Sequence, residues 1–159
     1  MRILGIDPGT GILGFGVIDV DKQGKSSLVD GGVIRTPVKQ ADSERLKTVY
    51  DELTEIIKAN KPEIMSVEKL FFSQNVTTAM SVSQARGVVL LCGVQNGLAL
   101  FEYTPQQIKQ AITGYGRADK KQVQEMVRVV LKLQEVPKPD DCADALAAAI
   151  CHSMTANYA

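Results

Sequence analysis

The stretch RILGIDPGTGILGFGVIDV, residues 2–20, holds the pattern that decides the fold. Residues 2–6 are an apolar run ending at Asp7, and the Pro-Gly pair that follows favours a turn. The apolar pattern resumes over residues 13–20, so the stretch predicts two strands joined by a tight turn. Residues 27–35 predict a third strand with a glycine bulge, which completes an antiparallel meander.

Helices and strands alternate after this meander. Residues 42–59 carry apolar side chains at helical spacing, and residues 63–68 read as a short buried strand. Residues 98–103 predict a fifth strand, and helical crossovers make such strands parallel. Further helices are expected at residues 76–96, 105–112, 119–133 and 140–155. The sequence therefore predicts an α/β fold: a mixed five-stranded sheet, an antiparallel meander plus parallel strands, flanked by helices on both faces.

The composition is that of an ordinary globular protein. The 159 residues are 45% hydrophobic and 23% charged, which suits a single domain over residues 1–159. A formal net charge of zero argues against a generally basic nucleic-acid binder but allows a local basic patch. The start, MRILGID, lacks the features of a signal peptide, so we expect a cytoplasmic protein without membrane contact.

The cysteines and the single histidine offer little chemistry. Cys92, Cys142 and Cys151 lie in apolar helical stretches without a C-x-x-C pair, so buried free thiols are expected. His152 is expected to interact with the dipole at the end of the last helix rather than to bind a ligand. A single histidine therefore argues against a catalytic mechanism of the Ser-His-Asp type or one based on a histidine cluster.

Four acidic residues are placed where they can meet. Asp7 and Glu68 end the first and fourth strands, which are expected to lie side by side with their carboxyl ends at one edge. Asp141 and Asp144 are spaced i, i+3 and share one helix face. Four carboxylates converge if the last helix packs over that edge.

Converging carboxylates favour a metal ion. They repel one another unless cations neutralise them. Mg²⁺ takes oxygen ligands and keeps water and substrate phosphates in its shell. Two such ions would clamp the attacking water and the leaving oxygen of a phosphodiester.

Each acid also has a simpler role when it is considered alone. Asp7 before Pro-Gly is typical of a turn, and Glu68 can mark where a strand emerges into solvent. Asp140 is favoured as the N-cap of the last helix, and Asp141 also suits its positive end. Asp144 is the hardest to explain in this way, because the apolar run ALAAAI follows it.

Five segments resemble, in order, the RuvC family of Holliday junction resolvases. They are GIDPGT at 5–10, a Glu followed by two aromatics at 68–72, QARG at 84–87, EYTPQQIKQAITGYGRADK at 102–120 and KPDDCADALAAAICH at 138–152. The resemblance runs over nearly the whole chain. It implies an RNase H-like fold and a Mg²⁺-dependent homodimer that nicks two strands of a four-way DNA junction, leaving 5′-phosphates.

The resemblance also implies roles for particular residues and partners. It carries the catalytic and metal-binding tetrad onto Asp7, Glu68, Asp141 and Asp144, and it leaves Asp140 outside. Two Mg²⁺ ions per active site are expected, with Mn²⁺ as a substitute. Branch-migration proteins RuvA and RuvB are the implied partners.

Aromatic residues are expected at the junction centre. Phe71 and Phe72 follow Glu68 on a stretch that looks like a loop tip. In RuvC-like proteins the aromatic residue at this position stacks on or wedges near bases at the junction centre. Stacking of an exposed ring on an unpaired base would stabilise the complex by roughly 1–3 kcal/mol. Core packing is the alternative, and we expect one ring exposed and one packed.

Basic residues gather in the second half of the chain. Residues 105–132 carry six basic and two acidic side chains, a net charge of +4. The candidate DNA contacts are Lys109 and Lys120, which the resemblance picks, with Arg117 and Lys121 in and after the glycine-containing GYGR loop. Arg128 and Lys132 are attributed to a solvated helix face.

The helix at 76–96 is the candidate dimer contact, through the resemblance and its broad apolar surface. Gly87 and Gly93 on it are expected to allow another backbone to approach closely. Lys69 stands beside Glu68 where a neutral polar residue is expected in relatives. It either contacts phosphate or points away.

Three other functions compete with junction cleavage. GIDPGTG resembles the phosphate-loop hairpin of actin-like kinases, although the chain is short for their two lobes and no adenosine-loop glycine motif follows. An inert junction-binding scaffold is the second alternative, and the complete set of acids speaks against it. The third is a general RNase H-like nuclease acting on RNA or hybrids.

Overall fold

A mixed sheet forms the centre of the molecule. The computed structural model describes residues 1–9, 11–69 and 76–156, and within them the chain forms a five-stranded sheet in the order β3-β2-β1-β4-β5. The strands are β1 (Arg2–Asp7), β2 (Ile12–Val20), β3 (Ser26–Arg35), β4 (Ile64–Glu68) and β5 (Ala99–Tyr103). β1, β2 and β3 pair antiparallel, whereas β4 pairs parallel with both β1 and β5. This is the predicted arrangement.

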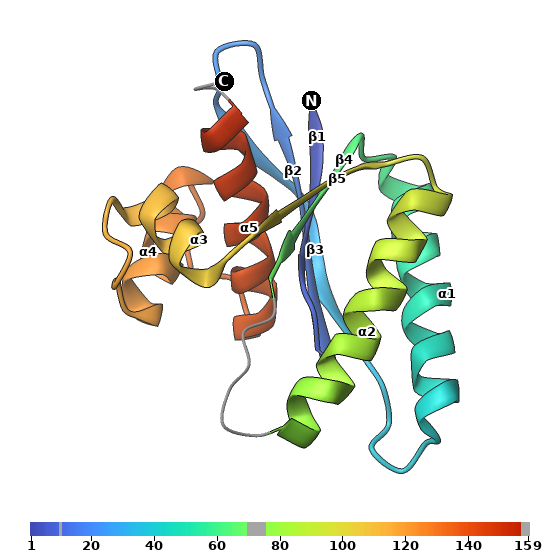
Figure 1. The fold of residues 1–159 in the computed structure, drawn as a ribbon. Coiled ribbons are helices and arrows are strands. Elements are labelled where there is room, and N and C mark those ends of the chain that lie inside the picture. The colour runs from blue at the N-terminus through green and yellow to red at the C-terminus, as the bar shows by residue number, and fades with distance from the viewer. Residues whose placement is uncertain (10, 70–75, 157–159) are drawn as a thin grey trace.

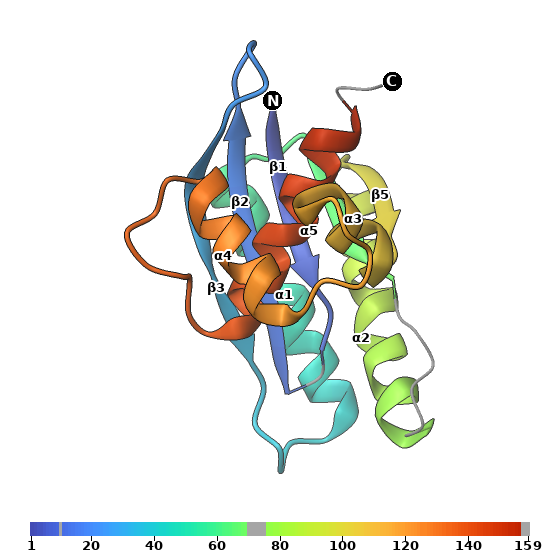
Figure 2. The same cartoon turned by 90° about the vertical axis from the view of Figure 1, so that its left-hand side faces the viewer.

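Helices cover both faces of the sheet (Figure 1). One face carries α1 (Asp42–Asn60) and α2 (Val76–Gln95), and the other carries α3 (Pro105–Thr113), α4 (Lys120–Val130) and α5 (Asp140–Ala156). Figure 2 looks onto the second face, where α5 lies against the sheet and α3 and α4 pack outside it. None of the described helices has the length and apolar character needed to cross a membrane.

The pleat of β1 divides its side chains between two cores. Leu4 and Ile6 pack in the core beneath α1 and α2. Ile3 packs in the core formed with α3, α4 and α5. Because successive side chains of a strand point to opposite faces, Asp7 shares the face of Ile3 and lies on the side of α5.

The predicted boundaries agree with the structure to within one residue, except at the end of α4. This helix stops at Val130, not at residue 133. Lys132 adopts a left-handed conformation with a φ of 56°. The N–H of Leu133 then returns to the carbonyl of Arg128 at 2.9 Å, which closes the helix end.

The predicted glycine bulge in β3 is wrong in its position. The ladder slips between Val17 and Ile18 of β2, whose partners are Asp30 and Leu28. Val29 is therefore the extra residue of the bulge. The glycine pair of β3 stays in register, and Gly31 leaves room for Cys142 of α5 while Gly32 leaves room for Phe15 of the neighbouring strand.

Two glycines of α2 differ from one another. A Cβ on Gly93 would lie 2.7 Å from Leu100 and 3.0 Å from Met65, so this glycine allows close packing on the sheet, although against side chains rather than backbone. Gly87 is exposed and meets nothing within 4 Å in this chain.

His152 contacts aromatic side chains rather than acting as the helix-dipole partner that its position predicts. It is buried, its Nδ1 lies 2.8 Å from the hydroxyl of Tyr103, and its ring contacts Phe101. Burial lowers the pKa of His152 and so favours the neutral ring. The three cysteines are free and buried, as predicted.

Candidate active site

Asp7 and Glu68 come together at the carboxyl ends of two neighbouring strands. The parallel register aligns Ile6 with Val67, and each acid follows directly. Met65 and Val67 of β4 pack beneath α1 and α2, so alternation places Glu68, like Asp7, on the side of α5. Their side chains share a hydrogen bond.

Two glycines of the sheet allow the start of α5 to pack close to Asp7 and Glu68. Gly14 of β2 is the ladder partner of Asp7. A Cβ on Gly14 would lie only 1.9 Å from the carbonyl oxygen of Asp141, and one on Gly5 would lie 2.0 Å from that of Ala145. The helix backbone therefore rests directly on the sheet, which sets Asp141 beside Asp7.

The four acids act on one another electrostatically. Burial is the main cause that raises the pKa of Asp7 to about 9. The negative charges of Glu68, Asp144 and Asp141 act in the same direction. Asp7 thus sits within the field of the other three acids and is protonated at neutral pH when no cation is present.

Two further acids of the group are also held above their ordinary pKa. Burial raises the pKa of Glu68, although the hydrogen bond from the protonated Asp7 and the charge of Lys109 oppose it. Burial likewise raises the pKa of Asp144, against the opposing charge of Lys120. The lysine charges therefore do not fully offset the effect of burial on either carboxyl group.

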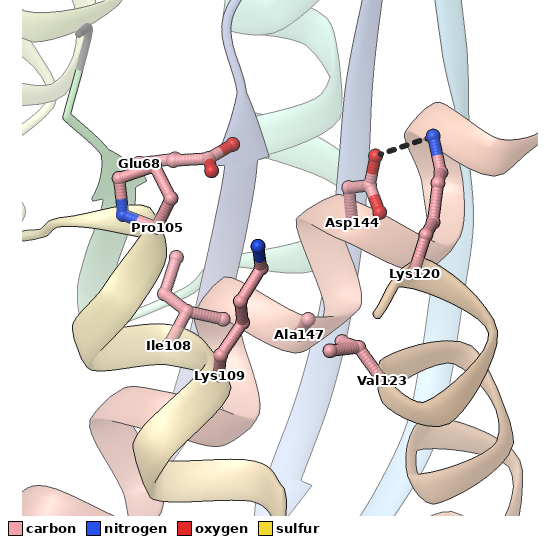
Figure 3. Close-up of a pocket in the computed structure, with 8 residues that line it drawn as sticks. All are labelled: Glu68, Pro105, Ile108, Lys109, Lys120, Val123, Asp144 and Ala147. Carbon is pink, nitrogen blue, oxygen red and sulfur yellow. Dashed lines mark ion pairs between the residues drawn. The ribbon is translucent and has the colours of Figure 1, made fainter. Parts of the chain in front are cut away.

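A pocket of about 220 Å³ opens between α3, α4 and α5 (Figure 3). Glu68 and Asp144 lie on opposite sides of it, and the ammonium group of Lys109 points between them. Lys120 reaches in from the start of α4, with its Nζ 3.4 Å from Oδ2 of Asp144. The pocket thus combines acids with two lysines.

Lys120 has two acidic partners. Its Nζ also lies 3.4 Å from Oδ2 of Asp140. Partial burial would lower the pKa of Lys120, but the charges of Asp144 and Asp140 outweigh it and the pKa is raised. Lys120 therefore stays charged beside the acids.

The structure corrects the predicted role of Asp140. This residue is the first of α5 and so lies within the helix rather than before it. The carboxylate of Asp140 pairs instead with Lys120 on a different helix. The sequence carried no signal for this pairing, because the two residues lie twenty positions apart.

A second pocket, of about 260 Å³, lies on the other side of Asp7 and Glu68. Its lining includes Lys69 and Arg86, so Lys69 borders the same pocket as the two acids. A contact between Lys69 and phosphate stays a prediction. Arg86 is ion-paired with Glu102 of β5. Sequence reasoning gave Arg86 no role, although it belongs to the QARG segment.

The remaining predicted DNA contacts are less central. Arg117 and Lys121 are exposed, and neither lines the pocket between Glu68 and Asp144. Phe71 and Phe72 lie outside the described residues, so their place at the junction centre stays a prediction.

The donor set suits a hard divalent ion. Carboxylate oxygens are the ligands that Mg²⁺ prefers, and Asp7 is partly buried within the field of three other acids. Across residues 1–9, 11–69 and 76–156, no three acidic, histidine or cysteine side chains already stand in an arrangement that holds a metal. The four acids would therefore have to turn toward a cation to bind it.

Comparison with known proteins identifies the family. A family model described as Crossover junction endodeoxyribonuclease RuvC matches residues 3–152. The protein of that name from Fusobacterium nucleatum is 56% identical over 152 residues, covering 96% of this chain and 80% of the relative. That from Heliobacterium modesticaldum is 55% identical over 157 residues, covering 98% and 96%.

Solved structures agree with the sequence relatives. Thermus thermophilus RuvC in complex with Holliday junction substrate superposes with a TM-score of 0.94 at 37% identity, covering 99% of this chain and 96% of that one. The yeast mitochondrial Holliday junction resolvase Ydc2, at 12% identity and a TM-score of 0.69, shares the fold. The fold is therefore RNase H-like, and the chain belongs to the RuvC family of crossover junction endodeoxyribonucleases.

Proposed function

We propose that this chain resolves four-way DNA junctions by paired, symmetric nicks, through metal-dependent phosphodiester hydrolysis that leaves 5′-phosphates. The observation that carries the proposal is the position of the partly buried Asp7 within the field of Glu68, Asp141 and Asp144, beside a pocket with two lysines. Membership of the RuvC family supports it and decides against the ATP-binding alternative.

Asp7, Glu68, Asp141 and Asp144 are the proposed metal ligands. Asp7 is the candidate for a ligand shared by two ions, because the other three acids all act on it. Mg²⁺ is the proposed metal, with Mn²⁺ as a substitute. When bound, it supplies a Lewis acid that activates water and offsets the charge of a phosphodiester.

Lys109 and Lys120 are the proposed contacts for the phosphate to be cut. Both ammonium groups reach the pocket that Glu68 and Asp144 line. A positive charge at this place favours the extra negative charge that develops on phosphorus during attack. Arg117 and Lys121 are proposed to hold the flanking DNA backbone, and Phe71 and Phe72 the bases at the junction centre.

Paired nicks require two sites, and we propose a homodimer built on α2. Val76, Met80, Leu91 and Val94 on this helix are each between 53% and 66% exposed. At 100° per residue these positions fall within an arc of about 60°, so they form one apolar stripe. A second copy that packs its own stripe there would bury both.

The proposal extends to the setting of the reaction. DNA recombination and repair in the cytoplasm is the proposed process, with the branch-migration proteins RuvA and RuvB as partners. A single domain over residues 1–159 suffices for it, because all four acids belong to elements of one sheet and the helix on it.

Cleavage of synthetic DNA tests the proposal. A four-way junction, a linear duplex and an RNA–DNA hybrid are incubated with the protein in Mg²⁺ or EDTA. We expect paired nicks in the junction alone, and only with Mg²⁺. Binding without cutting would favour an inert scaffold, and cutting of the hybrid would favour a general RNase H-like nuclease.

A further inference from the structure

Asp140 and Asp144 share one lysine. They lie one helical turn apart on α5, so their side chains stand on the same face. The Nζ of Lys120 is 3.4 Å from an oxygen of each. Lys120 belongs to a different helix, so its position between the two acids is a tertiary contact.

The two acids differ in their surroundings. Asp144 lines the pocket, and its side chain is 29% exposed. Asp140 is 63% exposed and does not line the pocket. Of these two acids, therefore, only Asp144 is placed to turn toward a metal ion beside Asp7. Asp140 lies outside the pocket lining, next to Lys120.

A metal ion and Lys120 compete for Asp144. The ammonium group already occupies an oxygen of this acid, so a cation that binds there must displace it or share it. Like charges a few ångströms apart repel, which pushes Lys120 away from Asp144 once the ion is in place. The nearest carboxylate that can then keep Lys120 beside the pocket is Asp140.

We propose that Asp140 is a positioning residue for Lys120. Its carboxylate draws the lysine partly off Asp144 before the metal binds, and it holds the lysine at the pocket mouth afterwards. The inference rests on the proposed function, because it takes Asp144 as a metal ligand and Lys120 as a phosphate contact. Asp140 itself touches neither the ion nor the DNA.

A purely structural role for Asp140 makes a different prediction. As a negative charge in the first turn of α5, it would stabilise the helix and attract any cation whether or not Lys120 is present. The effect of removing Asp140 would then be the same with lysine or glutamine at position 120. The two roles are separated by a double-mutant cycle.

Metal binding without DNA gives the first test. Mn²⁺ affinity is measured by electron paramagnetic resonance for the wild type, Asp140→Asn, Lys120→Gln and the double variant. Asp140→Asn is expected to weaken Mn²⁺ binding by about two- to five-fold, the range of an exposed ion pair, because Lys120 then pairs with Asp144 alone. In the Lys120→Gln background the same change is expected to have a smaller effect.

Junction cleavage at saturating Mg²⁺ gives the second test. Asp140→Asn is expected to slow the wild-type protein but not the Lys120→Gln variant, since there is no lysine left to hold. Asp140→Glu keeps the charge and is expected to restore part of the rate. Thermal unfolding of each variant checks folding, with Asp140→Ser as a second variant in case the Asn protein is unstable.

The outcomes separate this inference from the proposed function. Equal effects of Asp140→Asn in both backgrounds, or no effect in either, would overturn the positioning role. Failure of the wild type to cut junctions would overturn the proposed function. The Mn²⁺ measurement would still decide the inference in that case, because it uses no DNA.

Discussion

At the scale of single residues, Asp7 is the acid of the site whose pKa is raised to about 9 by its surroundings. It is partly buried beside Glu68, Asp141 and Asp144. Its position at the end of β1 follows from strand alternation, which the sequence shows. Its protonation follows from burial and three neighbours, which only the folded chain brings together.

The proton on Asp7 predicts how the metal-free stability depends on pH. The folded pKa of about 9 lies above the unfolded value near 3.8, so the folded state binds more protons between these limits. Stability measured in EDTA is therefore expected to fall as the pH rises from about 4 to about 9. Thermal unfolding across this range measures the effect.

Asp7→Asn supplies the control for this prediction. The amide cannot lose a proton, so the variant is expected to show a flatter pH dependence and a higher unfolding temperature than the wild type at pH 8 in EDTA. At pH 4 the two proteins should differ little. An equally steep decline in the variant would assign the pH dependence to other groups.

The sequence predicted which acids lie together, but it did not predict the ion pair between Lys120 and Asp140. Asp7, Glu68, Asp141 and Asp144 stand out because strand ends and helical spacing are local patterns. The pairing of Lys120 with Asp140 depends on how α4 lies across α5, which no local pattern encodes.

At the scale of elements, the contact between α5 and the sheet sets the site. Helix boundaries could be predicted because apolar spacing and capping residues are local, as the capping box of Thr104 and Gln107 at the start of α3 illustrates. The depth at which α5 rests on β2 could not. It depends on Gly14, whose importance appears only when Asp141 is set against it.

Gly14→Ala tests this contact. The added methyl group would lie 1.9 Å from the carbonyl oxygen of Asp141, so α5 must move. Overpacking of this kind costs about 1–3 kcal/mol, and a shift of Asp141 by 1 Å would slow cleavage by about a hundred-fold. Thermal unfolding and junction cleavage measure the two effects.

Gly11→Ala is the matched control for this substitution. Gly11 belongs to the same hairpin, but a Cβ there would meet only Nη2 of Arg45, at an ordinary 3.7 Å. We expect near wild-type stability and cleavage. If Gly14→Ala behaved like Gly11→Ala, the close approach of α5 would not matter for the site.

At the scale of the whole molecule, the two faces of the sheet have different tasks. The face with α3, α4 and α5 carries the acids and lysines, and the face with α1 and α2 presents the apolar stripe. The mixed sheet and the neighbouring positions of β1 and β4 were predicted correctly, because antiparallel hairpins and parallel crossovers leave few alternatives. The sequence could not show which apolar residues of α2 face the core and which face outward.

Leu91→Glu tests the role of the stripe. Leu91 is 53% exposed on α2. In a two-fold symmetric contact the change places two carboxylates in an apolar interface, so the dimer is expected to dissociate. Light scattering after size exclusion measures the mass, and linear product from a plasmid that extrudes a cruciform measures paired nicking.

Val129→Glu is the control for this variant. Val129 is 49% exposed on α4, far from α2 on the opposite face of the sheet. It should leave the dimer and the linear product unchanged. A monomeric wild type, or an unaffected Leu91→Glu dimer, would remove α2 as the contact.

The most direct test of the account is to locate the metal. Crystals grown with Mn²⁺ and measured at its absorption edge reveal the ions by anomalous scattering. The account predicts Mn²⁺ bound among the carboxylates of Asp7, Glu68, Asp141 and Asp144, and its loss from crystals of Asp7→Asn. Mn²⁺ held elsewhere, or held unchanged without the Asp7 carboxylate, would contradict the central claim that these four acids form one metal site.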